Sequence, residues 1–207
     1  MLRLALSPVW EKLFPDGLAC LLCGGPVEEA SQLCAACYEK MYIYEGPGHA
    51  VWEYFEAAAD AVRRLKFNDN TALARPMGVA MAGLARDHGI VADIIVPVPL
   101  HWRRQWMRGY NQSALLGGVM AYYLGIPLCK KALKRVRYTS SQMSLAREQR
   151  LVNLRGAFAA RGELVRGKRV LLVDDVATTG ATLHECKKTL IEAGCVRVIT
   201  LTACRVS

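Results

Sequence analysis

One segment constrains the fold more than any other. It reads Val-Leu-Leu-Val-Asp-Asp-Val-Ala-Thr-Thr-Gly-Ala-Thr-Leu and spans residues 170–183. An apolar run of this length, bounded by a turn, is typical of a strand buried on both faces of a parallel sheet. The small residues after the two acids predict a tight turn that opens a helix. Ligands of open α/β sheets collect at such junctions, at the carboxyl ends of the strands.

The turn has the composition of an anion site. Backbone N–H groups and hydroxyls at a helix N-terminus attract phosphate, and the helix dipole adds to that attraction. A glycine permits the close backbone approach that a phosphate requires. The residues predicted to hold the phosphate are Ala177, Thr178, Thr179, Gly180, Ala181 and Thr182, and Asp174 and Asp175 are placed to accept hydrogen bonds from vicinal sugar hydroxyls. The alternative is an ordinary capped helix with two solvated acids.

The rest of the chain after residue 52 alternates between strand and helix patterns. Strands are expected at 52–58, 93–100, 168–174 and 196–203, and helices at 71–87, 111–124 and 182–193, with a further helical segment through Lys66. Residues 136–156 are basic and weakly periodic, which favours a long loop. The alternation predicts a central parallel sheet with helices on its faces.

Four cysteines near the N-terminus form two close pairs. Cys20, Cys23, Cys34 and Cys37 have the spacing C-x2-C-x10-C-x2-C, which suits a tetrahedral site for a structural Zn²⁺ ion. Redox-active pairs are the alternative.

No export signal is recognisable, so we expect a cytoplasmic, reducing location in which disulfides are disfavoured. We therefore divide the chain into an N-terminal arm with a zinc module (1–48) and an α/β domain (49–207).

Positive charge is concentrated in one third of the chain. Residues 101–169 carry 15 Lys and Arg against two acids, whereas the whole chain has a net charge of +9. This bias predicts a polyanionic partner such as phosphates or nucleic acid, with a solvated basic face as the alternative. Trp102, Trp106 and Tyr110 lie within the tract and could stack on bases, or simply pack on the domain. The uncharged stretch 110–129 is expected to be a buried helix rather than a transmembrane segment.

The segment 170–183 resembles the signature with which type I phosphoribosyltransferases bind phosphoribosyl pyrophosphate (PRPP). Further motifs narrow the resemblance to the ComF family: Pro-Val-Pro-Leu at 97–100, then Arg104, then Arg-Gly-Tyr-Asn-Gln at 108–112, and a second block from Thr139 to Phe158. The similarity covers about residues 50–205 and the cysteine module. One departure is Phe55-Glu-Ala-Ala58, where the family usually has a glycine after an aromatic residue.

The resemblance implies a type I phosphoribosyltransferase-like fold that binds PRPP together with Mg²⁺. It implies that the two acids contact the ribose, that the turn holds the 5′-phosphate, and that a mobile hood covers the site. The pyrophosphate residues would be Pro99, Leu100, His101 (through its backbone N–H), Arg104 and Arg108, and the hood residues Arg137, Gln142, Arg147 and Arg150.

Three functions are compatible with these features. The ComF resemblance implies a PRPP-binding protein that handles incoming single-stranded DNA during natural transformation, with a competence helicase as a possible partner. The second reading is a phosphoribosyltransferase that acts on an unidentified nucleobase, although no residue is recognisable as the acid or base for that reaction. The third is a zinc-bearing adaptor that senses PRPP.

Overall fold

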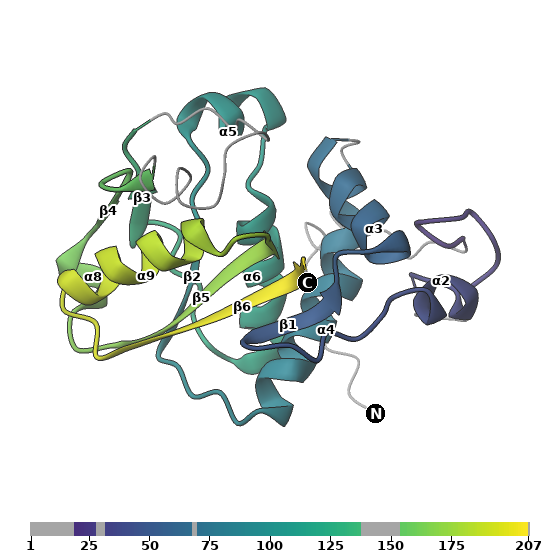
Figure 1. Ribbon diagram of the computed structural model, residues 1–207, viewed down its shortest axis with the longest axis horizontal. Coiled ribbons are helices and arrows are strands. Elements are labelled where there is room, and N and C mark those ends of the chain that lie inside the picture. The colour runs from purple at the N-terminus through teal and green to yellow at the C-terminus, as the bar shows by residue number, and fades with distance from the viewer. Residues whose placement is uncertain (1–18, 28–31, 68–69, 138–153, 207) are drawn as a thin grey trace.

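A parallel sheet forms the centre of the protein. The computed structural model describes residues 19–27, 32–67, 70–137 and 154–206. Its main sheet has four strands in the order β1 (His49–Glu53), β6 (Arg197–Arg205), β5 (Arg169–Ala177) and β2 (Ile94–Pro97), and each neighbouring pair is parallel (Figure 1). The expected parallel sheet is therefore confirmed.

Helices cover both faces of this sheet (Figure 1). Side chains alternate between the two faces of a strand, and the apolar run of β5 follows this rule. Leu171 and Val173 belong to the apolar cluster of α4 (Ala74–Asp87) and α6 (Gln112–Leu124), whereas Val170 and Leu172 belong to the cluster of α9 (Ala181–Glu192). Burial on both faces explains why this strand reads as a continuous apolar segment.

The long helices are close to their predicted bounds. The predicted helix 71–87 begins with one 3₁₀ turn, η1 (Thr71–Leu73), and continues as α4. Helix α6 begins after Asn111, whose side-chain oxygen accepts a hydrogen bond of 3.3 Å from the Ala114 N–H, and ends at Gly125, where φ is +68°. In the described part of the chain, no helix combines the length and hydropathy that a bilayer crossing requires.

The predicted strand at 52–58 is wrong after residue 53. Strand β1 ends at Glu53, and helix α3 (Glu56–Phe67) begins three residues later. The alanines from Ala57 to Ala61 have high helix propensity, and four of the five residues 57–61 are alanine.

A small antiparallel ribbon lies within the basic tract. Strand β3 (Leu133–Arg135) pairs with β4 (Phe158–Ala160), and the short helix α8 (Gly162–Val165) follows. The predicted loop 136–156 thus begins and ends on a ribbon that contacts α9. Sequence analysis did not predict this ribbon, because its strands are only three residues long and one of them is largely basic.

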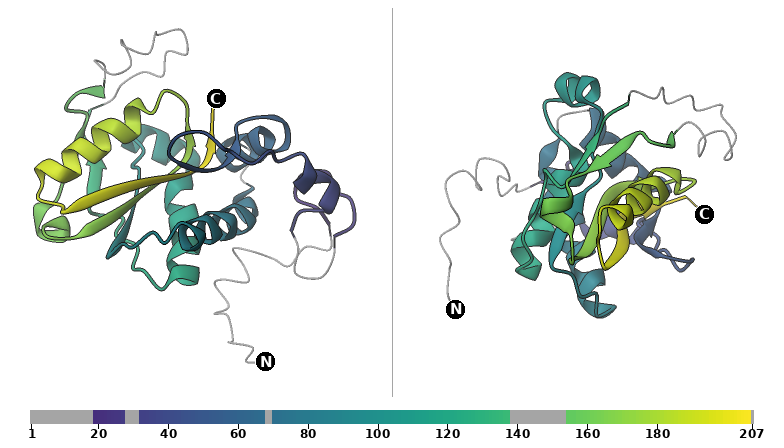
Figure 2. Two further views of the ribbon diagram at one scale, coloured as in Figure 1. Left: turned by 60° about the horizontal axis from the view of Figure 1, so that its bottom comes forward. Right: turned by 90° about the vertical axis from the view of Figure 1, so that its left-hand side faces the viewer.

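The four-cysteine segment lies at one end of the long axis of the molecule, at the opposite end from α8 (Figures 1 and 2). It contains the short helix α2 (Ala35–Glu39). Cys20, Leu22 and Leu33 belong to the same apolar cluster as α3, and the Arg64 guanidinium donates a hydrogen bond of 3.3 Å to the Leu21 carbonyl. The segment therefore packs against the main body through α3.

Candidate phosphoribosyl site and metal centre

The predicted anion turn is open. Strand β5 ends at Ala177 and α9 begins at Ala181, so Thr178, Thr179 and Gly180 form the turn between them. Gly180 has φ +73°, a conformation that favours glycine. Among the described contacts, no acceptor binds the backbone N–H groups of these three residues. The turn therefore presents N–H donors at a helix N-terminus, as an anion site requires.

Asp174 lies beside this turn and is partly exposed. Its Oδ1 accepts a hydrogen bond of 2.7 Å from the Ser113 hydroxyl and one of 2.9 Å from the Asp175 N–H. Burial, together with the neighbouring Asp175 carboxylate, raises the pKa of Asp174 to about 7, although the hydrogen bond from Ser113 and the Lys66 ammonium oppose this shift. Asp174 can therefore change its protonation state near neutral pH.

Asp175 has a different environment. It is only 5% exposed, and its Oδ1 lies 3.1 Å from the Lys66 Nζ. A buried carboxylate needs such a partner because removing a charge from water is costly. Sequence reasoning treated the two acids as equivalent and assigned no role to Lys66, which is 109 positions away from Asp175 along the chain.

The predicted pyrophosphate residues follow the neighbouring strand β2. Residues 99–101 lead into helix α5 (Trp102–Arg108), so Arg104 and Arg108 lie on a helix. His101 is buried, and its Nδ1 accepts a hydrogen bond of 3.3 Å from the Arg103 N–H. The Arg108 guanidinium stacks over the Phe67 ring, 4.7 Å from its centroid. The structure describes the backbone of Arg104 but not its side chain.

The ribbon β3–β4 supports the start and the end of the predicted hood. The Arg137 guanidinium donates a hydrogen bond of 2.8 Å to the Arg155 carbonyl, and the Glu185 carboxylate of α9 accepts one of 2.7 Å from the Gly156 N–H. The predicted hood residues Gln142, Arg147 and Arg150 lie outside the described residues. Their role in covering the ligand stays a prediction.

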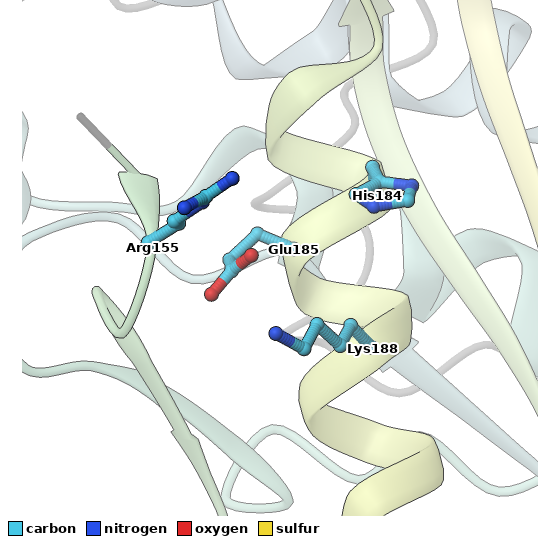
Figure 3. Close-up of a pocket in the computed structure, with 4 residues that line it drawn as sticks. All are labelled: Arg155, His184, Glu185 and Lys188. Carbon is cyan, nitrogen blue, oxygen red and sulfur yellow. The ribbon is translucent and has the colours of Figure 1, made fainter. Parts of the chain in front are cut away.

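A pocket that sequence analysis did not predict lies beside this ribbon. It is lined by Arg155, His184, Glu185 and Lys188 and has a volume of about 280 Å³. Figure 3 shows Arg155 reaching toward α9 from the segment before β4, with Glu185 and Lys188 extending from α9 toward it. The Glu185 carboxylate accepts a hydrogen bond from the Gly156 N–H. This hydrogen bond links α9, on one side of the pocket, to the end of the predicted hood.

The four cysteines converge as predicted. Their sulfur atoms all lie within 4.8 Å of one another, and the Sγ atoms of Cys23 and Cys34 are 3.6 Å apart. In a tetrahedral site with Zn–S bonds of about 2.3 Å, the sulfur atoms are separated by about 3.8 Å. The Gly25 N–H lies 3.4 Å from the Cys23 Sγ and donates to it. The cluster could therefore hold a zinc ion.

Local hydrogen bonds prepare one of these thiols for ionisation. Burial raises the pKa of Cys20, but backbone N–H groups of Cys34, Cys23 and Leu22 outweigh it and lower the pKa to about 6. Metal binding requires thiolates, so a lowered pKa favours it. Of the remaining four cysteines, Cys186, Cys195 and Cys204 are buried as expected, whereas Cys129 is partly exposed.

Comparisons with known proteins agree with this geometry. The family profile described as "Phosphoribosyl transferase domain" matches residues 111–207, which confirms the expected fold. Competence protein F of Haemophilus influenzae is 36% identical over 84% of this chain and 79% of its own length. DNA utilization protein YhgH of Salmonella typhimurium is 36% identical over 90% of this chain and 83% of its own length.

Among solved structures, glutamine PRPP amidotransferase from B. subtilis superposes with a TM-score of 0.48 at 21% identity, over 69% of this chain and 30% of that one.

Proposed function

Because this chain belongs to the competence protein F family, we propose that it binds PRPP with Mg²⁺ and handles single-stranded DNA in the cytoplasm during natural transformation. The observation that carries the first half is the open turn after β5, with its N–H donors at the start of α9 and Asp174 beside it. A phosphate on the turn and a ribose against the acid would occupy both features at once.

The segment after β2 would hold the pyrophosphate. The backbone at residues 99–101 and the guanidinium groups of Arg104 and Arg108 would provide the donors. These residues follow β2, which is hydrogen-bonded directly to β5. Guanidinium groups bind phosphate oxygens by charge-assisted hydrogen bonds. Mg²⁺ would enter as the partner of the pyrophosphate oxygens, because this ion is usually held by phosphates with one or two carboxylates.

Helix α5 supports the nucleic-acid half of the proposal. Trp102 is 64% exposed and Trp106 is 84% exposed, so neither ring packs into the domain. Arg103 stacks on Trp102, 5.3 Å from the ring centroid. Exposed aromatic rings among basic residues provide stacking platforms for single-stranded bases, at about 1–3 kcal/mol per base.

Calorimetry with Mg·PRPP tests the first half. Wild type should bind, the variant Asp174→Asn/Asp175→Asn should lose most of its affinity, and Asp87→Asn, an exposed acid at the end of α4, should bind like wild type. Equal binding by the double variant and wild type would refute the assignment. Release of pyrophosphate from PRPP with a panel of nucleobases then separates a transferase from a protein that only binds.

Single-strand binding measured against salt concentration tests the second half. Trp106→Ala should weaken binding about fivefold or more, whereas Tyr123→Ala, an exposed aromatic at the other end of α6, should not. A salt-independent signal, or equal loss in both variants, would argue against α5 as the platform.

The cysteine module would hold a structural zinc ion. Its four sulfur atoms all lie within 4.8 Å of one another. The segment has little apolar core of its own, so the metal would supply much of its folding energy.

A further inference from the structure

Helix α3 ends in three consecutive residues that contact two separate segments, residues 108–110 and strand β5. The Leu65 carbonyl accepts a hydrogen bond of 2.7 Å from the Tyr110 hydroxyl. The Lys66 ammonium lies 3.1 Å from the Asp175 carboxylate. The Phe67 ring lies under the Arg108 guanidinium. The end of this helix therefore joins the acid pair on β5 to the segment that follows β2.

The two acids are divided between different partners. Neighbouring residues of a strand point to opposite faces, so Asp174 and Asp175 cannot share one environment. Asp175 is buried and lies against Lys66. Asp174 is partly exposed and accepts from Ser113 at the start of α6. The cation on α3 thus engages the acid that is less accessible to a ligand.

We propose that Lys66 is a positioning residue of the phosphoribosyl site: its ammonium holds the buried Asp175 carboxylate, and Asp174 is left as the acid that accepts the ribose hydroxyls. This inference rests on the proposed binding of PRPP. It assigns different tasks to two acids that the sequence motif presents as a pair. It also adds a residue from α3 to a ribose-phosphate site otherwise built from β5, α6 and the turn before α9.

The charges around the pair support this division. The Lys66 ammonium pairs with Asp175 and also lowers the pKa of Asp174. The Asp175 carboxylate has the opposite effect and raises the pKa of Asp174. Among the described residues, the thiols of Cys186 on α9 and Cys204 on β6 also interact with the pair. Burial raises the pKa of both thiols, that of Cys204 to about 12, so they stay neutral. Without Lys66 the pair would retain a proton to higher pH.

A double-mutant cycle tests the pairing. Mg·PRPP affinity would be measured by calorimetry for wild type, Lys66→Met, Asp175→Asn and the double variant. Lys66→Met should weaken binding about tenfold or more, because it leaves a buried carboxylate unpaired. The double variant should lose much less than the product of the two single losses. Lys66→Arg should restore most of the affinity, and Arg63→Met, which removes an exposed cation from the same helix, should bind like wild type.

The pH profile separates positioning from a merely structural role. Wild-type affinity should rise between pH 6 and 8 as Asp174 loses its proton, and Lys66→Met should move that midpoint to higher pH. If Lys66→Met binds Mg·PRPP as tightly as wild type does, or if the midpoint of its pH profile is not shifted, the inference is overturned. The proposed function would still stand.

Ligand-free measurements separate the two failures. If wild type does not bind PRPP, the proposed function fails, and the Asp174 carboxyl titration followed by ¹³C NMR still decides whether Lys66 sets the charge of the acid pair. A higher Asp174 pKa in Lys66→Met supports it. An unchanged pKa, together with additive shifts of the melting temperature across the cycle, would overturn it.

Discussion

Gly78 lies where α4 crosses α6, and its replacement offers a sharp test of the packing that holds α6 in place. A Cβ atom added at Gly78 would lie 2.6 Å from the Val119 Cβ and 3.2 Å from the Leu116 carbonyl oxygen. Neither atom is the end of a flexible side chain, so the helices would have to separate. Overpacking of this kind costs about 1–3 kcal/mol, while alanine returns up to about 1 kcal/mol of helix propensity. We expect Gly78→Ala to lower the free energy of unfolding by about 1–2 kcal/mol.

The same helix contains a matched control. A Cβ atom at Gly83 would meet nothing within 4 Å, so Gly83→Ala gains the propensity without the clash and should stabilise the protein by about 0.5–1 kcal/mol. Urea unfolding followed by circular dichroism would measure both variants. A Gly78→Ala variant as stable as Gly83→Ala would refute the reasoning, because it would mean that α4 and α6 are not in close contact at this point.

Three other features give measurable expectations. Hydrogen bonds from Arg169 lower the pKa of Asp93 to about 2. The contribution of this pair to stability is therefore present above about pH 4 and is lost as the pH falls toward 2. In Asp93→Asn the melting temperature should change less over that pH range than in wild type. Asn111→Ala should lower the free energy of unfolding, measured with urea, by about 1–2 kcal/mol, since it removes both the cap of α6 and the hydrogen bond to the Val98 carbonyl. Asn111→Asp retains the cap alone, so its free energy of unfolding should fall by less. A strong chelator should remove about one zinc ion per chain, measured by elemental analysis, and should speed amide exchange in residues 19–40 while β5 stays protected; uniform loss of protection would contradict a separately stabilised module.

The phosphate turn could be predicted from sequence because the residues that determine it are close together along the chain. Strand, acids, turn and helix follow one another within 14 residues, and each type of residue has a local physical reason. The convergence of the four cysteines was equally accessible, since two close pairs need only a short loop between them. The predicted helices 111–124 and 182–193 agree with α6 and α9 to within one residue at each end, because Gly125 and Gly194 mark where they stop.

The parts that sequence reasoning missed depend on distant contacts. Nothing near Lys66 signals that its ammonium reaches Asp175, because that contact requires α3 to lie against the sheet. The ribbon β3–β4 is too short for a periodic pattern, and it forms because Phe158 and Leu133 join the cluster under α9. The pocket around Glu185 likewise brings together residues from α9 and from the end of the hood.

The order of strands in the sheet has a consequence for the growing polypeptide. The two central strands, β5 and β6, are the last of the four to be synthesised, while the earlier strands β1 and β2 end up at the two edges and never touch each other. During synthesis, the apolar faces of α4 and α6 therefore lack the two central strands of the sheet until β5 and β6 have emerged. A truncation that removes only the nine residues of β6 would therefore also leave β1 without its partner strand and β5 without one of its two partners.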